Sequence, residues 1–173
     1  LIPTVEEAIA HPAHPEGLSF GICWQYGTDK EKNYISKLKA IKNCRIIALT
    51  ASQACGVGWA RSLVQKLWEK ERYTLQIDAH MRFLPGWDVE LIKMLKRCPS
   101  EKPLLSTYPP AYRPPRELLG DTPSRLEPSQ FGDPGTLTLK AIGDLSKCST
   151  PQLGAFVAAG FIFAEGSIIE EVP

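Results

Sequence analysis

The sequence predicts one α/β domain with a mostly parallel central sheet, spanning residues 1–173. Short apolar, β-prone runs alternate with amphipathic helical patterns between residues 44 and 108, which is the rhythm of strand–helix–strand units. The 173 residues are enough for one domain with a substantial core, and 43% of them are hydrophobic. That hydrophobic content is typical of a globular rather than a disordered protein.

The first third of the chain is expected to form a short helix and two strands. Thr4 and Glu7 have the spacing of a capping box, which predicts a helix with Thr4 as its N-cap. Residues 18–24 and 44–50 are apolar, β-prone runs, and each is expected to be a strand. The polar, lysine-rich segment between them, residues 25–41, is expected to be a loop with one helical turn and a solvated face.

The middle of the chain gives the clearest helical signal. From Ala60 the apolar residues recur at positions i, i+3, i+4, i+7 and i+8, which predicts an amphipathic helix. The apolar run 73–77 follows as a buried strand, and the turn at 85–88 leads into a second amphipathic helix with Asp88 as its N-cap. Residues 103–108 are expected to be the next strand.

Residues 109–135 differ in character from the rest of the chain. Seven of the fifteen prolines fall in this segment, together with several glycines. A long irregular connection of this kind is typical of a functional lid or a poorly ordered segment. Beyond it, residues 136–142 are expected to form a strand, and residues 158–164 a buried strand near the site.

Composition and charge argue against several classes of function. The formal net charge is +1, so nothing indicates a nucleic-acid partner or an anionic membrane surface. No apolar run approaches the roughly 20 residues that span a bilayer, so no membrane segment is expected in this chain. The five cysteines are scattered without a C-x-x-C pair, which favours a reduced, cytoplasmic protein over a disulfide scaffold or a zinc ribbon.

A candidate metal site follows the strand at 73–77. Asp78 and His80 are two residues apart, so on a continuing strand they would share one face. A carboxylate oxygen with an imidazole nitrogen suits Mn²⁺, Zn²⁺ or Fe²⁺ better than Ca²⁺. The pair alone is a weak signal, because Asp and His at strand ends are ordinary turn residues.

Small residues at 51–58 lead into the helix that contains Arg61, and the start of this helix is a candidate phosphate site. Its free backbone N–H groups and positive dipole end suit an anion. The alternative is that Gly56 and Gly58 only let the loop turn. Ligands of open α/β sheets bind beyond the carboxyl ends of the strands. A metal held by Asp78 and His80, with the helix start and Arg61 nearby, is therefore expected to form a diphosphate cradle. Such a cradle would stabilise a departing pyrophosphate. The sequence contains no Walker loop and no dinucleotide fingerprint.

Five segments carry motifs that recur together in one enzyme family. They are G-V-G-W-A-R at 56–61, L-Q-I-D-A-H-M-R-F at 75–83, W-D at 87–88, S-T-Y-P at 106–109 and A-G-F-I-F-A at 159–164. This set closely resembles the polypeptide/Skp1-type N-acetylglucosaminyltransferases. The order of the motifs is also similar to that of the polypeptide N-acetylgalactosaminyltransferases, in which the Asp and His of D-x-H both hold Mn²⁺.

The resemblance implies a GT-A nucleotide-diphospho-sugar transferase fold and a metal-dependent, retaining glycosyltransferase. Such an enzyme would use Mn²⁺ or another divalent cation to move a sugar, expected to be GlcNAc, from a UDP-sugar to a hydroxyl of a protein or peptide acceptor. Carried over by position, Asp78 and His80 would be the metal ligands. No catalytic residue is assigned by the motifs. The donor-binding residues would be Gly58, Arg61, Asp78, Ala159 and Gly160.

Two departures from the family pattern bear on activity. Only residues 1–3 precede Thr4, where the family has a strand that helps to hold the uracil, and the acidic and histidine residues expected after Pro173 are missing. The chain is therefore expected to be truncated at both ends and not fully active. Arg82 matches the motif without an assigned step, and Trp87 is expected to be a packing residue. Two alternatives stay open: a nucleotidyltransferase on a related fold, and a nucleotide-binding domain without turnover.

Overall fold

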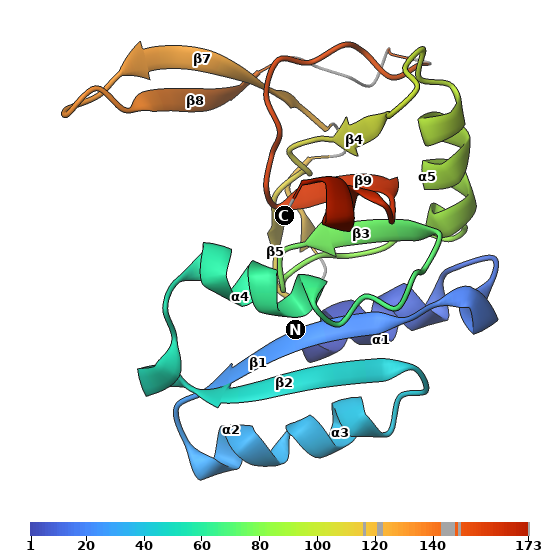
Figure 1. Ribbon diagram of the computed structural model, residues 1–173, viewed down its shortest axis with the longest axis vertical. Helices are drawn as coiled ribbons and strands as arrows, with labels where there is room; N and C mark the ends of the chain where they lie inside the picture. Colours follow the sequence, from blue (N-terminus) through green and yellow to red (C-terminus); the bar gives the residue numbers. More distant parts are fainter. Residues whose placement is uncertain (116, 121–122, 143–147, 149, 173) are drawn as a thin grey trace.

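The computed structural model describes residues 1–115, 117–120, 123–142, 148 and 150–172, which form a mixed α/β structure (Figure 1). None of the helices in these ranges has the length and apolar character needed to cross a bilayer. The helices are α1 (Ile2–Ala10), α2 (Asp29–Asn33), α3 (Ile35–Lys39), α4 (Val57–Gln65), α5 (Trp87–Lys96) and α6 (Ile168–Glu171), with 3-10 turns at Pro15–Gly17 and Ala51–Gln53. The strands are β1 (Phe20–Tyr26), β2 (Cys44–Thr50), β3 (Tyr73–Ile77), β4 (Leu104–Ser106), β5 (Tyr112–Arg113), β6 (Glu117–Leu118), β7 (Arg125–Phe131), β8 (Leu137–Ile142) and β9 (Phe161–Glu165).

Strands β1 and β2 are parallel and have helices on both faces. On one face Ile22 of β1 forms a buried cluster with Val5 of α1 and Leu38 of α3. Gly21 points to the other face, where a Cβ would lie 3.2 Å from Cγ1 of Val64 in α4. The period-two alternation of a strand therefore separates α1 and α3 from α4.

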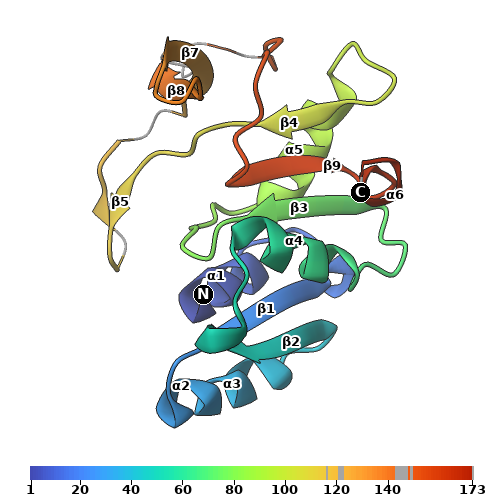
Figure 2. The same ribbon diagram turned by 60° about the vertical axis from the view of Figure 1, so that its left-hand side comes forward.

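The second sheet corrects the prediction of a mostly parallel sheet. Strand β9 lies between β3 and β4 and is antiparallel to both. Strands β3 and β4 consequently run in the same direction, as the strand–helix–strand pattern predicted, but a strand from near the end of the chain lies between them. A local pattern cannot indicate this, because the long segment 107–160 separates β9 from β4. In both views the strands follow one another in the order β2, β1, β3, β9, β4 (Figures 1 and 2).

Several predicted elements are confirmed, but two predicted helix starts are wrong. Strands β2 and β3 have the predicted bounds, and the lysine-rich segment forms two short helices rather than one turn. Helix α1 begins at Ile2, so Thr4 is a buried interior residue rather than the N-cap. Helix α5 begins at Trp87 after Gly86, whose φ is 72°, so Asp88 lies in the first turn. Thr4 and Asp88 each bond instead to a segment 75 residues away.

The predicted irregular connection at 109–135 contains regular structure. Strands β5 and β6 form an antiparallel hairpin, and β7 pairs with β8. The β7–β8 pair projects from the remainder of the structure (Figure 1), and Phe131 at the end of β7 is 75% exposed. The prolines of this segment therefore do not prevent strand pairing, and Pro128 itself lies within β7 opposite Leu139.

Candidate functional site

Asp78 lies at the carboxyl end of β3, where the pairing of β3 with β9 brings Gly160 alongside it. Ile77 pairs with Phe161. One residue further, the backbone N–H of Asp78 donates to the carbonyl oxygen of Gly160 over 3.2 Å. Two predicted site residues are thus neighbours through a strand pairing that the sequence pattern did not reveal.

Gly160 gives the Asp78 carboxylate the space that it occupies. A Cβ at position 160 would lie 2.6 Å from Oδ2 and 3.2 Å from Cγ of Asp78. Close-packed protein interiors do not accommodate a contact that short, so any larger residue would displace the carboxylate. The glycine is needed here for a close approach and not for an unusual backbone angle.

Arg61 reaches the same carboxylate from α4. Its Nη2 donates to Oδ1 of Asp78 over 3.1 Å. The side chains of Arg61 and Asp78 are 26% and 43% exposed, so solvent reaches the pair. Helix α4 starts after Gly56, whose φ is 93°. The structure therefore brings Arg61, Asp78 and Gly160 together at the carboxyl end of β3.

Strand β3 ends at Ile77 and residues 79–80 form a turn, so Asp78 and His80 do not share one face of a continuing strand as predicted. His80, Gly58 and Ala159 are exposed residues. The imidazole of His80 makes no hydrogen bond or ion pair with the residues that the structure describes. Gly58 lies in the first turn of α4, where a Cβ would meet no atom within 4 Å. The carbonyl oxygen of Ala159 accepts from Nε2 of Gln76 over 3.1 Å. All three residues are accessible to a ligand.

The donor set at this cluster suits a divalent cation. A carboxylate oxygen from Asp78 and an imidazole nitrogen from His80 are ligands that Mn²⁺ and Zn²⁺ accept. Oδ1 of Asp78 is bonded to Arg61, which leaves Oδ2, beside Gly160, for a cation. The described ranges contain no group of three or more His, Cys, Asp or Glu side chains that could enclose a metal ion. A cation here would need further ligands, such as the oxygens of a bound diphosphate or water.

The segment after Asp78 is held by α1, a contact that the sequence analysis missed. Oγ1 of Thr4 donates to the carbonyl oxygen of Ala79 over 2.7 Å. Oε2 of Glu7 accepts from the backbone N–H of Phe83 over 3.3 Å. The one signal in the sequence is the spacing of Thr4 and Glu7, which places them on one face of a helix but also fits a capping box.

Arg82 and Trp87 both contact other parts of the chain through their side chains. Nε and Nη2 of Arg82 donate to the carbonyl oxygen of Pro115 over 3.1 and 3.0 Å, and its guanidinium lies 4.6 Å from the ring centre of Tyr112. Nε1 of Trp87 donates to the carbonyl oxygen of Ala8 over 3.2 Å. The Trp87 ring also packs against Phe83, with ring centres 4.8 Å apart, as expected of a packing residue. Arg82 connects the Asp78 loop to the β5–β6 hairpin.

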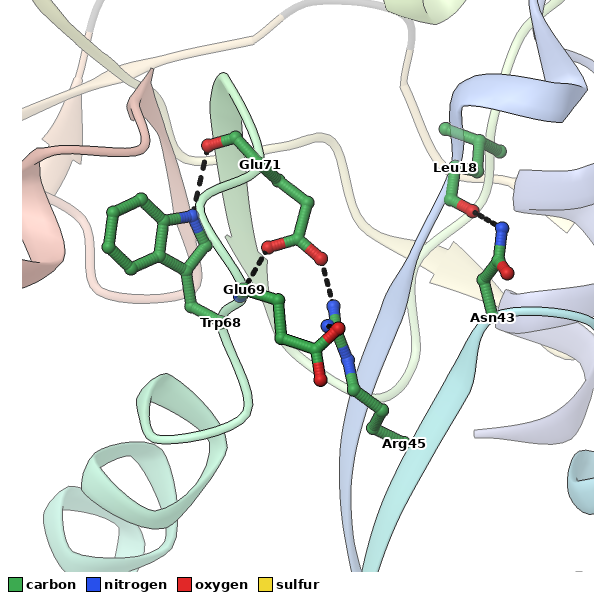
Figure 3. A network of polar contacts seen from close by, with 6 residues as sticks. All are labelled: Leu18, Asn43, Arg45, Trp68, Glu69 and Glu71. Carbon is green, nitrogen blue, oxygen red and sulfur yellow. Dashed lines mark hydrogen bonds and ion pairs between the residues drawn. The ribbon is translucent and has the colours of Figure 1, made fainter.

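A second arginine–carboxylate cluster connects β2 to the loop before β3 (Figure 3). Arg45 bonds to Glu71 and lies 2.6 Å from Glu69, measured from Nη1 to Oε2. Oε2 of Glu71 also accepts from the backbone N–H of Glu69 over 2.7 Å, and Trp68 donates to the Glu71 carbonyl oxygen over 2.9 Å. Burial raises the pKa of Glu71, but the hydrogen bonds from Arg45 and from the Glu69 amide outweigh it and hold the pKa below its usual value. Since protein donors use both carboxylate oxygens of Glu71, we interpret this cluster as structural.

The cysteines do not support thiol chemistry. All five are free, and Cys55 and Cys148 are exposed. Burial raises the pKa of the thiols of Cys23, Cys44 and Cys98, which disfavours their reactive thiolate form. The candidate site therefore consists of the residues around Asp78.

Comparison with known proteins identifies the family of the chain. The family model described as Glycosyltransferase (GlcNAc) matches residues 4–173, a range that includes the whole Asp78 cluster. No curated protein and no solved structure matches the chain. The family match extends over nearly every residue, from the first turn of α1 to the last residue. The chain belongs to the GlcNAc glycosyltransferase family.

Proposed function

We propose that the chain is the donor-binding part of a metal-dependent, retaining glycosyltransferase of the polypeptide/Skp1 type with a GT-A fold. In this proposal GlcNAc passes from UDP-GlcNAc to a hydroxyl of a protein acceptor. The observation that supports it best is the placement of Asp78 between the Arg61 guanidinium and Gly160 at the carboxyl end of β3. Ligands of α/β sheets bind at this kind of edge.

Arg61 and the start of α4 are the groups that would receive the diphosphate. Helix α4 has nine residues, and the N–H groups of its first turn have no partners within the helix. Its positive dipole end favours an anion, and Gly58 presents no side chain that would keep phosphate oxygens away. The guanidinium of Arg61 would add a cationic donor that stabilises the leaving UDP.

Asp78 and His80 would hold the divalent cation, for which Mn²⁺ is our first candidate. When bound, this cation would neutralise negative charge on the departing diphosphate. Gly160 leaves space for the Asp78 carboxylate, and the exposed Ala159 beside it would border the donor sugar. None of these residues is assigned the role of a general acid, a general base or a nucleophile.

Titration calorimetry with UDP and UDP-GlcNAc, with and without Mn²⁺, tests this proposal. We expect Mn²⁺-dependent binding of both ligands, weakened at least about tenfold by His80→Ala, because the imidazole is a metal ligand. His14→Ala is the matched control, since the side chain of His14 is 69% exposed and contacts Glu16 instead. Binding that does not depend on Mn²⁺, or full binding by His80→Ala, would contradict the metal site.

A nucleotide-binding domain without turnover is the second candidate. The observation that favours it is the incomplete metal-ligand set in the described ranges. Both candidates predict UDP binding, so the discriminating measurement is release of UDP from UDP-sugars in the presence of hydroxyl-bearing peptides. Release with glycosylated peptide supports the transferase, and binding without release supports the second candidate. The family match favours sugar transfer over nucleotidyl transfer.

A further inference from the structure

Helix α1 buries two faces that differ in chemistry. Val5 packs with Ile22 and Leu38 in the hydrophobic core. Thr4 and Glu7, three residues apart and so on one face, are 3% and 7% exposed although both are polar. Burial of a hydroxyl and a carboxylate is unfavourable unless each has a hydrogen-bond partner. The hydrogen bonds made by this polar face therefore account for the burial of Thr4 and Glu7.

The polar face of α1 holds the backbone on both sides of His80. On one side, the hydroxyl of Thr4 donates to the carbonyl oxygen of Ala79 over 2.7 Å. On the other side, the carboxylate of Glu7 accepts from the backbone N–H of Phe83 over 3.3 Å. Because His80 lies between these two anchors, the path of its backbone is determined by α1.

Arg82 adds a charged contact to the same anchor. Its Nε lies 3.6 Å from Oε1 of Glu7, and the two side chains are 17% and 8% exposed. Nη1 of Arg82 donates to the carbonyl oxygen of Met81 over 2.8 Å, so the guanidinium also fixes the backbone next to it. A carboxylate that is buried and paired in this way cannot lose its partner without a large penalty.

The contacts of α1 and the turn after it continue along the loop as far as α5. They involve both backbone and side-chain groups, and they leave the loop little freedom to move away from α1. They are Gly86 N–H to His11 carbonyl oxygen at 2.6 Å, Trp87 Nε1 to Ala8 carbonyl oxygen at 3.2 Å, and Ala13 N–H to Asp88 Oδ1 at 2.8 Å.

We propose that Thr4 and Glu7 are positioning residues for the divalent-cation site, because they fix the loop that carries His80, two residues after Asp78. The inference rests on the proposed function, since it concerns the same cation. The imidazole of His80 has no partner among the described residues, so its position depends on its backbone. Groups that orient a metal ligand typically change metal affinity about 10–100-fold when they are removed.

The test measures Mn²⁺ binding in the presence of UDP, from the electron paramagnetic resonance signal of free Mn²⁺, together with thermal unfolding. Thr4→Val keeps the shape of the side chain but loses the donor, and we expect about tenfold weaker Mn²⁺ binding. Thr4→Ser keeps a hydroxyl and should stay within about twofold of wild type. Val5→Ala is the matched control, because it weakens the core face of α1 and leaves the loop contacts intact. We expect this control to lower Tm without changing Mn²⁺ affinity.

A folded Thr4→Val variant with wild-type Mn²⁺ affinity overturns the proposal. A Val5→Ala variant that loses Mn²⁺ affinity along with its Tm overturns it too. If Thr4→Val does not fold, Glu7→Gln is measured in its place. The glutamine keeps an oxygen that can accept from the Phe83 backbone N–H, but it loses the negative charge that faces Arg82. We expect at least about threefold weaker Mn²⁺ binding from it, and unchanged binding overturns the proposal. A wild-type chain that binds no Mn²⁺ in the presence of UDP refutes the proposed function itself, an outcome distinct from the failure of positioning alone.

Discussion

The two arginine–carboxylate clusters of this chain differ in what surrounds the carboxylate. Both oxygens of Glu71 are used by protein donors, and the side chains of Arg45 and Glu71 are 23% and 24% exposed. Asp78 has one oxygen bonded to Arg61 and the other beside Gly160, and its side chain is 43% exposed. A carboxylate used entirely by the protein stabilises the fold, whereas a half-open one is available to a ligand. An ion pair is therefore evidence of a binding site only when one of its members keeps a free, accessible atom.

Among single substitutions, Gly160→Ala should have the largest effect, and this effect should be confined to the Asp78 cluster and leave the Arg45–Glu71 cluster intact. The new Cβ would lie 2.6 Å from Oδ2 of Asp78, so the carboxylate must leave its present position. We expect Mn²⁺-dependent UDP binding, measured by calorimetry, to weaken about 100-fold, or ~2.7 kcal/mol. The structural cluster at Arg45 and Glu71 should be unaffected, so urea unfolding should change much less.

Gly17→Ala provides the control for this substitution. A Cβ at position 17 meets no atom within 4 Å, so neither binding nor unfolding is expected to change. Wild-type UDP affinity in Gly160→Ala would show that binding does not need the Asp78 carboxylate in its present position. That result would remove the main structural support for the proposed donor site.

Glu71→Gln should have the next largest effect, and it should lower stability without changing UDP binding. In glutamine one of the two oxygen positions becomes an NH2 donor, so either the Arg45 guanidinium or the Glu69 backbone N–H loses its acceptor on residue 71. We expect the free energy of unfolding at pH 7 to fall by about 2 kcal/mol, measured by urea denaturation. UDP binding should remain at the wild-type level.

The pH dependence of this effect follows from the lowered pKa of Glu71. Burial raises that pKa, but the hydrogen bonds from Arg45 and the Glu69 amide bring it below the ordinary value of about 4.3. Because the folded-state pKa is lower than the unfolded one, the stabilisation is complete above about pH 4.3 and disappears as the pH falls through the folded-state value. The difference in the free energy of unfolding between wild type and Glu71→Gln should therefore become smaller in acid.

Glu90→Gln is the control for Glu71→Gln, because it removes an exposed ion pair with Lys93. It should lower the free energy of unfolding by less than Glu71→Gln does. An equal loss of stability would contradict the distinction between the two kinds of ion pair.

The parts of the fold that local patterns encode were predictable from the sequence. Strands β2 and β3 match their predicted bounds because each is a mostly apolar, β-prone run between polar segments. Arg61 and Asp78 were expected to lie near each other because each follows a predicted strand, and the hydrogen bond between them agrees with this expectation, although β2 and β3 belong to different sheets. The position of β9 between β3 and β4 was not, because the partner of a strand is chosen by pairing across a long stretch of sequence.

The buried polar residues show why part of the site could not be predicted. Thr4, Glu7 and Asp88 fit local capping patterns, but their side chains bond to distant backbone groups instead. A capping hydrogen bond and a tertiary hydrogen bond use the same atoms, and the sequence alone does not show which one forms. The contact between Gly160 and Asp78 depends in the same way on β9, so a motif could indicate the residues but not their proximity.

Gly58→Ala should have the smallest effect and separates two explanations for the glycines before α4. A Cβ at position 58 meets no atom within 4 Å, and alanine is favoured over glycine within a helix, so we expect unfolding to become harder by up to ~0.5 kcal/mol. If the first turn of α4 receives the diphosphate, the methyl group should still weaken UDP binding about threefold, because it hinders the approach of phosphate oxygens to the backbone N–H groups. Ser62→Ala, at an exposed position of the same helix, is the control for helix propensity and should leave UDP binding unchanged. Wild-type UDP affinity in a stabilised Gly58→Ala variant would instead mean that the glycine at position 58 is not needed for phosphate binding.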